Sequence, residues 1–295
     1  MTSATSPTGR PGFRELHHQR LPLVLPNAWD VPSALAFADA GFAAVGTTSF
    51  GIASGLGRPD GGGATRGANL ALARALAPLP VHVSVDIEDG YSDDPDEVAA
   101  YVWALAAARD GSRDTSRDTS RDTSRDVSHA GTGVAGVNIE DSTAEALIDP
   151  ATHAAKVAAV KGRCPEVFVN ARIDTYWLDQ DAGLAATLDR AARYVEAGAD
   201  GVFVPGATDP AVLRELAGAV PVPLNVLPIP GLSVAELGEL GVRRVSTGSL
   251  PYRAALHAAV RVAETVRGTG TGTLPEATPY PELQARLIDY ASRLM

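Results

Sequence analysis

The chain has 295 residues, and its 25 lysine and arginine residues are outnumbered by 35 aspartate and glutamate residues, giving a net charge of −10. An acidic chain with only 5% aromatic residues lacks the basic patches and stacking platforms that hold nucleic acid, so we expect no nucleic-acid partner. The single cysteine, Cys164, excludes an intrachain disulfide and a cysteine-based zinc site, and it is typical of a cytoplasmic protein.

The N-terminal segment does not resemble a targeting signal. Residues 1–12 are rich in serine, threonine, proline and glycine and contain no apolar core of a signal peptide. No run of about 18 uncharged apolar residues follows anywhere in the chain, so we expect no transmembrane helix and no membrane partner. We interpret residues 1–12 as a flexible tail.

Short β-rich runs then alternate with longer helical patterns. Several of the runs are apolar throughout their middles, which is typical of strands that are covered on both faces. The predicted strands are Leu21–Pro26, Ala43–Thr48, Val81–Glu88, Gly136–Asp141, Val167–Ile173, Gly201–Pro205, Pro223–Leu227 and Arg244–Gly248.

The intervening segments carry helical periodicity, and several end in glycine, as helix C-caps do. The predicted helices are Val31–Ala40, Ala68–Leu76, Asp96–Ala107, Pro150–Val160, Leu184–Ala197, Pro210–Gly218, Val234–Leu240 and Pro251–Val266. Eight alternating units predict an α/β fold, a (β/α)8 TIM barrel over residues 13–268. A doubly wound sheet is the alternative, but the glycine-rich phosphate loop that it requires does not follow the first strand. A C-terminal extension, 269–295, adds one more helix, Pro281–Leu294.

One segment, residues 111–130, is a low-complexity insertion built on an Arg-Asp-Thr-Ser repeat. It contains no apolar residue before Val127, so we expect a mobile loop. It lies between a helix and the next strand, on the barrel face opposite to the one that carries chemistry. We favour a tolerated duplication over a modifiable or interacting arm.

Acidic residues gather where two neighbouring strands end. Asp86 and Glu88 close the third strand and, by strand alternation, point to the same side, and Glu140 closes the fourth. Active sites of such barrels lie at these carboxyl ends. Three converging carboxylates repel each other unless a cation lies between them, so we predict a Mg²⁺ site. The alternative is that these acids pair with basic side chains.

Two further strand ends offer groups for an anion. Arg172, at the end of the fifth strand, has the fork geometry that binds a carboxylate or phosphonate, although it could instead pair with Glu140 or Asp174. Gly46–Ala53, after the second strand, is rich in hydroxyl groups and glycine and can hold an anion through its backbone. The glycine-rich segment that follows supplies one more acid, Asp60.

Taken in order, these segments resemble the isocitrate lyase/phosphoenolpyruvate mutase superfamily, over residues 13 to 268. The resemblance rests on Asn27–Asp30, Gly46–Ser49, Asp60, Asp86–Tyr91, Asn138–Asp141 and Asn170–Asp174. It implies a (β/α)8 barrel that forms a homo-oligomer, a tetramer or a dimer in which the eighth helix is exchanged between subunits.

The resemblance also implies roles for individual residues. Mg²⁺, with Mn²⁺ as an alternative, is expected near Asp60, Asp86, Glu88 and Glu140, mostly through water. The substrate-binding residues that it implies are Thr48, Ser49, Phe50, Asp86, Arg172, Asn225 and Ser246.

The chain departs from the superfamily after its fourth strand. Lyases of the superfamily carry Lys-Lys/Arg-Cys-Gly-His there, with the cysteine as acid/base, and mutases carry a loop with lysine and asparagine. Residues 141–150 contain neither motif and run directly into a helix, and Cys164 lies on the opposite face. The remaining candidates for catalysis are Arg172, Glu88 and Tyr91, although Tyr91 could equally be a packing residue.

These observations favour a Mg²⁺-dependent lyase that acts on a small 2-oxo or 2-hydroxy carboxylic acid. Carbon–carbon cleavage or decarboxylation would pass through an enolate whose charge the metal and Arg172 stabilise. One alternative is P–C bond chemistry, as a mutase or hydrolase, on phosphonopyruvate. Another is a barrel that binds a 2-oxo acid without catalysis.

Overall fold

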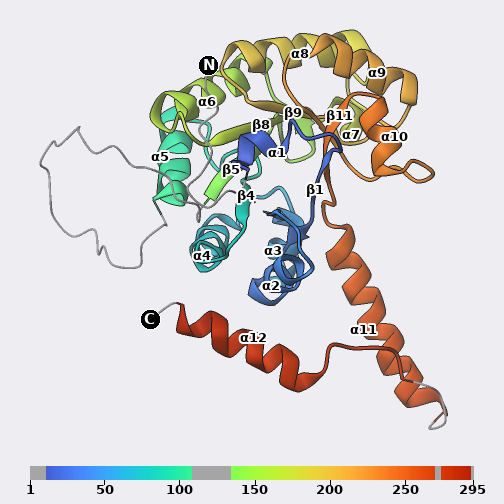
Figure 1. Cartoon of the computed structure of the whole chain (residues 1–295). Helices are drawn as coiled ribbons and strands as arrows, with labels where there is room; N and C mark the ends of the chain where they lie inside the picture. The colour runs from blue at the N-terminus through green and yellow to red at the C-terminus, as the bar shows by residue number, and fades with distance from the viewer. Residues whose placement is uncertain (1–10, 108–133, 270–273, 294–295) are drawn as a thin grey trace, which may run out of the picture.

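A computed structural model describes residues 11–107, 134–269 and 274–293 (Figure 1). Most of the expected tail and the whole Arg-Asp-Thr-Ser insertion lie outside these residues. Within them, no helix has both the length and the apolar character needed to span a bilayer. The cytoplasmic location expected from the single cysteine stays a prediction.

In the described part of the chain, nine parallel strands form one sheet in the order β1-β11-β10-β9-β8-β5-β4-β3-β2. Their bounds are β1 Leu23–Leu25, β2 Asn27–Ala28, β3 Ala44–Thr47, β4 His82–Asp86, β5 Val134–Glu140, β8 Phe168–Arg172, β9 Gly201–Phe203, β10 Leu224–Val226 and β11 Val242–Ser246. β1 and β2 are one strand interrupted at Pro26, which has no N–H to give to a ladder. Since β1 pairs with β11 and β2 pairs with β3, the strands close on themselves, and the predicted TIM barrel is confirmed.

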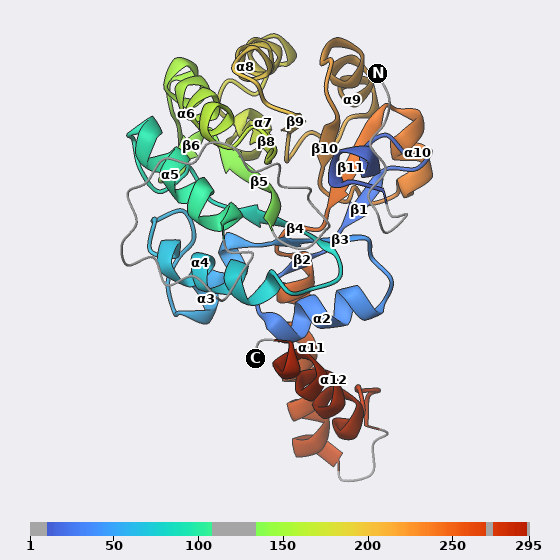
Figure 2. The same ribbon diagram turned by 60° about the vertical axis from the view of Figure 1, so that its left-hand side comes forward.

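Most of the helices surround this barrel on its outside, and the last two extend away from it (Figure 2). The principal ones are α2 Val31–Asp39, α4 Arg66–Leu76, α5 Pro95–Ala106, α6 Pro150–Arg163, α8 Leu184–Glu196, α9 Pro210–Ala219, α10 Val234–Glu239, α11 Leu250–Thr269 and α12 Tyr280–Ser292. The three short helices α1 Phe13–Leu16, α3 Ser49–Gly55 and α7 Thr175–Leu178 were not expected from the sequence. α1 and α7 have four residues each, too few to show a helical period, and most of α3 lies in the segment expected to be an anion-binding turn.

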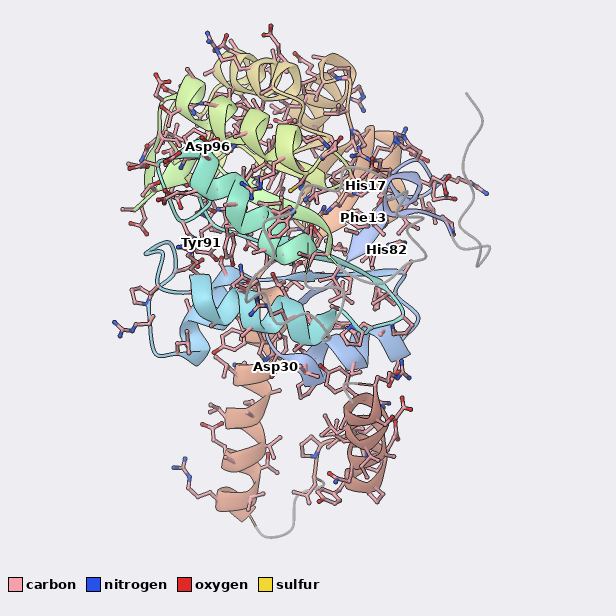
Figure 3. All side chains as sticks on the ribbon, turned by 90° about the vertical axis from the view of Figure 1, so that its left-hand side faces the viewer. Phe13, His17, Asp30, His82, Tyr91 and Asp96 are labelled. Atoms are coloured by element: carbon pink, nitrogen blue, oxygen red, sulfur yellow. The ribbon has the colours of Figure 1, made fainter. Side chains whose placement is uncertain are left out.

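Aromatic rings close the amino-terminal end of the barrel. His17 stacks on Phe168 with ring centroids 4.3 Å apart, and Phe13 meets Phe168 edge-on at 5.5 Å. Figure 3 places Phe13, His17 and His82 together, at the side away from Tyr91. Any cavity in the barrel therefore opens at the carboxyl ends of the strands.

The last two helices leave the barrel. α11 projects outward and α12 turns back towards the barrel (Figure 1). α12 is attached through the Tyr290 hydroxyl, which donates to the Ala75 carbonyl, and through Arg286, which lies 2.9 Å from Asp39. α11 keeps large apolar side chains in water, among them Leu256, Val260 and Val266, at 51%, 58% and 64% exposed.

Candidate active site

A cavity of about 230 Å³ lies at the carboxyl ends of the strands. Of the residues that the sequence predicts for substrate or metal, seven line it: Thr48, Ser49, Phe50, Asp60, Asp86, Arg172 and Ser246. Asn225 does not line the cavity but donates to the Ser246 hydroxyl oxygen at 3.0 Å. Residues far apart in the sequence, from β3 to β11, thus meet in one small space.

The turn after β3 is tightly built around Asp86. Thr48 caps α3, and the Ser49 backbone N–H donates to the Asp86 carboxylate at 3.1 Å. Gly51 faces Trp29 so closely that a Cβ would lie 2.7 Å from the Trp29 Cβ, which explains the glycine. At least one of the N–H groups expected to hold an anion, that of Ser49, therefore binds a carboxylate of the protein itself. Thr48 and Ser49 also line the cavity.

Asp60 and Asp86 are the two carboxylates at the cavity surface. Burial raises the pKa of Asp60, and the nearby charge of Asp86 raises it further, while a hydrogen bond from Ser49 opposes the shift. Two carboxylates that line one small cavity favour a cation between them.

Glu88 lies behind this pair, 2% exposed, with φ of 50° in the left-handed region. Its carboxylate accepts from the Thr65 hydroxyl and from the Gly63 N–H at 2.9 Å. Burial is the main cause that raises the pKa of Glu88. The Tyr91 hydroxyl bonds Thr65 at 2.9 Å and Asn69 at 3.0 Å and is not among the groups that line the cavity.

Glu140 forms an ion pair with Arg172, with the Glu140 carboxylate 2.7 Å from Arg172 Nη1. Arg172 Nε donates to Asp174 at 2.6 Å, so both pairings considered from the sequence are present. Burial raises the pKa of Glu140 well above its usual value, and the Arg172 charge opposes the rise. Two buried acids thus hold the Arg172 guanidinium in place at the cavity wall.

The donor set fits Mg²⁺ if the ion is held largely through water. Among the described residues, no three histidine, cysteine, aspartate or glutamate side chains converge to bind a metal directly. Mg²⁺ usually binds one or two carboxylates and keeps several waters. Asp60 and Asp86 would supply those carboxylates, since Glu88 and Glu140 are bound to protein groups behind them.

The segment after β5 does not run directly into a helix. It forms a two-stranded hairpin, β6 Ser142–Thr143 and β7 Ala146–Leu147, with Ala144 and Glu145 at positive φ. The Gln180 side chain bonds both Leu147 and Glu145, and Thr143 donates to Asp89 at 2.6 Å. The expectation missed the hairpin because its turn has no glycine or asparagine, the residues that signal such turns.

Several cavity residues were not among the predicted site residues. They are Asn27, Asn138, Trp177, Phe203, Pro205, Leu227, Pro228, Thr247, Gly248, Ser249, Leu250 and Arg253. Asn27 and Asn138 belong to the matched motifs and could have been found from them. Arg253, on α11, gives the cavity a second guanidinium, and it forms no ion pair with any residue that the structure describes.

This geometry defines the class of protein. It is a (β/α)8 barrel whose catalytic-face cavity joins two carboxylates, two guanidinium groups and several hydroxyl groups, a set suited to a small acidic molecule and a hard cation.

Residues 13–110 and 116–267 match the family model described as phosphoenolpyruvate phosphomutase, and the chain belongs to this family. The resemblance to the isocitrate lyase/phosphoenolpyruvate mutase superfamily is thereby confirmed. The superfamily comprises Mg²⁺-dependent lyases and mutases that act on small carboxylic acids, and its members often form oligomers.

Two curated relatives cover nearly the same length. The uncharacterized protein Rv1998c of Mycobacterium tuberculosis is 58% identical over 281 residues, which are 95% of this chain and 98% of that protein. The 2-methylisocitrate lyase of Salmonella typhimurium is 28% identical over 279 residues, 88% of this chain and 85% of the lyase.

Two solved structures share the fold. A candidate lyase/mutase of Burkholderia cenocepacia J2315 has 31% identity and a TM-score of 0.78 over 94% of each chain. Phosphonopyruvate hydrolase, solved as a complex with oxalate and Mg²⁺, has 22% identity and a TM-score of 0.75 over 94% of this chain and 95% of its own.

Proposed function

We propose that this protein is a Mg²⁺-dependent lyase that breaks a bond to C3 of a small 2-oxo or 2-hydroxy carboxylic acid. The observation that carries this proposal is the cavity itself, which Arg172 lines together with the carboxylates of Asp60 and Asp86. The guanidinium suits the substrate carboxylate, and the two acids suit the cation that the family uses.

Arg172 binds the substrate carboxylate and stabilises the negative charge that develops when the bond to C3 breaks. Glu140 and Asp174 fix the guanidinium before the substrate arrives, so little reorganisation is needed during the reaction. The Thr48 hydroxyl donates a hydrogen bond to the same carboxylate. Ser49 orients the two acids beside it, because its N–H donates to Asp86 and its hydroxyl donates to Asp60. Bound Mg²⁺ would supply positive charge to the substrate oxygens.

The other predicted residues act from behind the cavity. Glu88 carries negative charge towards the cation, and Tyr91 fixes Thr65, the partner of Glu88, rather than serving as a base. Asn225 holds Ser246 at the floor. Arg253 has no acidic partner in the described residues and suits a second acidic group, so a dicarboxylic acid is the preferred substrate class.

The test is consumption of oxaloacetate, 2-methylisocitrate and phosphonopyruvate, each with Mg²⁺ and with excess chelator. We expect either oxaloacetate or 2-methylisocitrate to be consumed, and only when Mg²⁺ is present. Glu88→Gln should lose most of this activity. Full metal-dependent activity in Glu88→Gln contradicts the proposal. Phosphorus NMR that shows loss of the P–C bond supports phosphonopyruvate chemistry instead, and calorimetric binding without consumption supports a binding protein.

We further propose that the protein is a homo-oligomer in which α11 packs on the barrel of a partner subunit. The exposed apolar side chains on α11 support this packing, because a large apolar surface that is exposed to water is typical of an interaction site. Light scattering should give a dimer or tetramer of the 30.5 kDa chain. The double variant Leu256→Asp, Val260→Asp should form an assembly of lower mass than the wild type. Arg261→Ala on the same helix should keep the wild-type mass. A monomeric wild-type protein contradicts the proposal.

A further inference from the structure

A buried arginine lies beneath the cavity floor. Arg244 extends from β11 into the barrel and is 0% exposed. Burial lowers the pKa of Arg244 to about 9, and the negative charge of Asp86 opposes that shift. The side chain therefore stays charged at neutral pH, although Arg244 is not among the residues that line the cavity.

Arg244 donates to two residues that do line the cavity. Its Nε donates to the Ser246 hydroxyl oxygen at 3.0 Å, and its Nη2 donates to Asn138 Oδ1 at 3.2 Å. Each of these two oxygen atoms accepts a second hydrogen bond from an asparagine side chain. Asn225 Nδ2 donates to Ser246 Oγ at 3.0 Å, and Asn170 Nδ2 donates to Asn138 Oδ1 at 2.8 Å.

These four bonds decide which atoms face the ligand. A hydroxyl or amide oxygen has two lone pairs, and here donors occupy both on Ser246 and both on Asn138. The Ser246 O–H and the Asn138 NH₂ are then left to donate, and neither donates to another group in the part of the chain that the structure describes. A flipped Asn138 amide would place its NH₂ against two other donors, so the observed orientation is fixed.

We propose that Arg244 is a positioning residue that makes the cavity floor a surface of hydrogen-bond donors for a negatively charged oxygen of the ligand. The ligand oxygen is a carboxylate oxygen or the oxygen on which charge develops. This surface compensates for the two acids, Asp60 and Asp86, that the same cavity presents. The choice of an anionic ligand rests on the proposed function, but the donor character of the floor does not.

Oxalate is the probe, with calorimetry in saturating Mg²⁺ as the measurement. Ser246→Ala removes one donor, and we expect its dissociation constant for oxalate to rise about tenfold. Ser84→Ala is the matched control, because the Ser84 hydroxyl is buried on β4 without a partner among the described residues and does not line the cavity. It should bind oxalate as the wild type does.

Asn138→Asp keeps the oxygen that Arg244 and Asn170 bind and exchanges only the cavity-facing NH₂ for an acceptor. We expect oxalate binding to weaken by about tenfold or more. Oxamate binding should weaken less, because the amide of oxamate can donate to the new carboxylate. Equal losses for both probes would show that the added charge alone matters and would overturn the donor assignment at Asn138.

Arg244→Lys tests the positioning role, since a single ammonium group cannot reproduce the fork. We expect weaker oxalate binding, and a loss in the Arg244→Lys, Ser246→Ala double variant that is smaller than the sum of the single losses. Additive losses would show that Arg244 acts only as packing. If Arg244→Lys does not fold, the Ser246 and Asn138 variants decide: wild-type oxalate binding in both overturns the inference. Because binding alone is measured, absence of turnover would contradict the proposed function and leave this inference standing.

Discussion

Arg172→Met is expected to lower kcat/KM for the acid that the protein consumes by about 10²- to 10³-fold, the usual effect of removing one group that stabilises developing charge. The guanidinium lines the cavity, and Glu140 and Asp174 hold it from behind. Methionine fills much of the same volume and leaves the substrate carboxylate without its partner. Steady-state kinetics in saturating Mg²⁺ measures the effect.

The same substitution leaves two buried carboxylates without their cation, which costs about 3–5 kcal/mol in comparable cases. Arg172→Lys separates the two effects, because it keeps the charge but lacks the planar fork that bonds Glu140 and Asp174 and presents further N–H groups to a substrate. We expect Arg172→Lys to remain folded and still lose most activity. Arg193→Met, which removes a half-exposed arginine of α8, is the matched control and should keep full activity. A folded Arg172→Lys with wild-type kcat/KM would exclude Arg172 from the reaction.

The second large effect concerns acid stability and depends on His153. This histidine of α6 is completely buried against Tyr194, with ring centroids 4.4 Å apart, and neither ring nitrogen has a hydrogen-bond partner in the described residues. Burial, assisted by the charges of Lys156 and Arg190, lowers the pKa of His153 to about 3. Unfolding exposes the imidazole to water, where its pKa returns to 6.5.

Between pH 6.5 and about 3, His153 therefore binds a proton in the unfolded chain but stays neutral in the folded chain. The free energy of unfolding consequently decreases as the pH falls. The slope is about 1.4 kcal/mol per pH unit, or roughly 3 kcal/mol by pH 4.5. His153→Leu and His153→Phe remove this dependence without breaking a hydrogen bond. Their stability relative to wild type should improve by that slope as the pH falls, measured by urea unfolding at a series of pH values.

The comparison with wild type is needed because other groups titrate in the same range. Burial raises the pKa values of Glu88 and Glu140, so these acids favour the folded state as the pH falls. They are present in every variant and cancel in the difference. Leucine and phenylalanine differ in volume, so the two variants will differ in absolute stability. Their free energies of unfolding relative to wild type must nevertheless change with pH by the same slope. A difference that does not change with pH would show that folding leaves the pKa of His153 unchanged.

Much of the fold could be predicted from local patterns. Apolar runs such as the one that forms β8, and the proline and aspartate residues that begin α6, act within a few residues of sequence. The carboxylates and Arg172 could be assigned to one end of the barrel, because the carboxyl ends of parallel strands must meet there. The β6–β7 hairpin could not, since Gln180, a residue of another segment, holds its turn.

The sequence by itself determined the order of strands and helices, the barrel and the face on which chemistry occurs, because these follow from periodicity and from the direction of the chain. Only the tertiary structure decided what each polar group does there. Glu88 and Tyr91 became linked through Thr65, Arg253 entered the cavity from a projecting helix, and Arg244 turned two neutral side chains into donors. Hydrogen bonds are directional and short, and their partners here come from separate segments of the chain, which lie up to 106 residues apart in the case of Arg244 and Asn138.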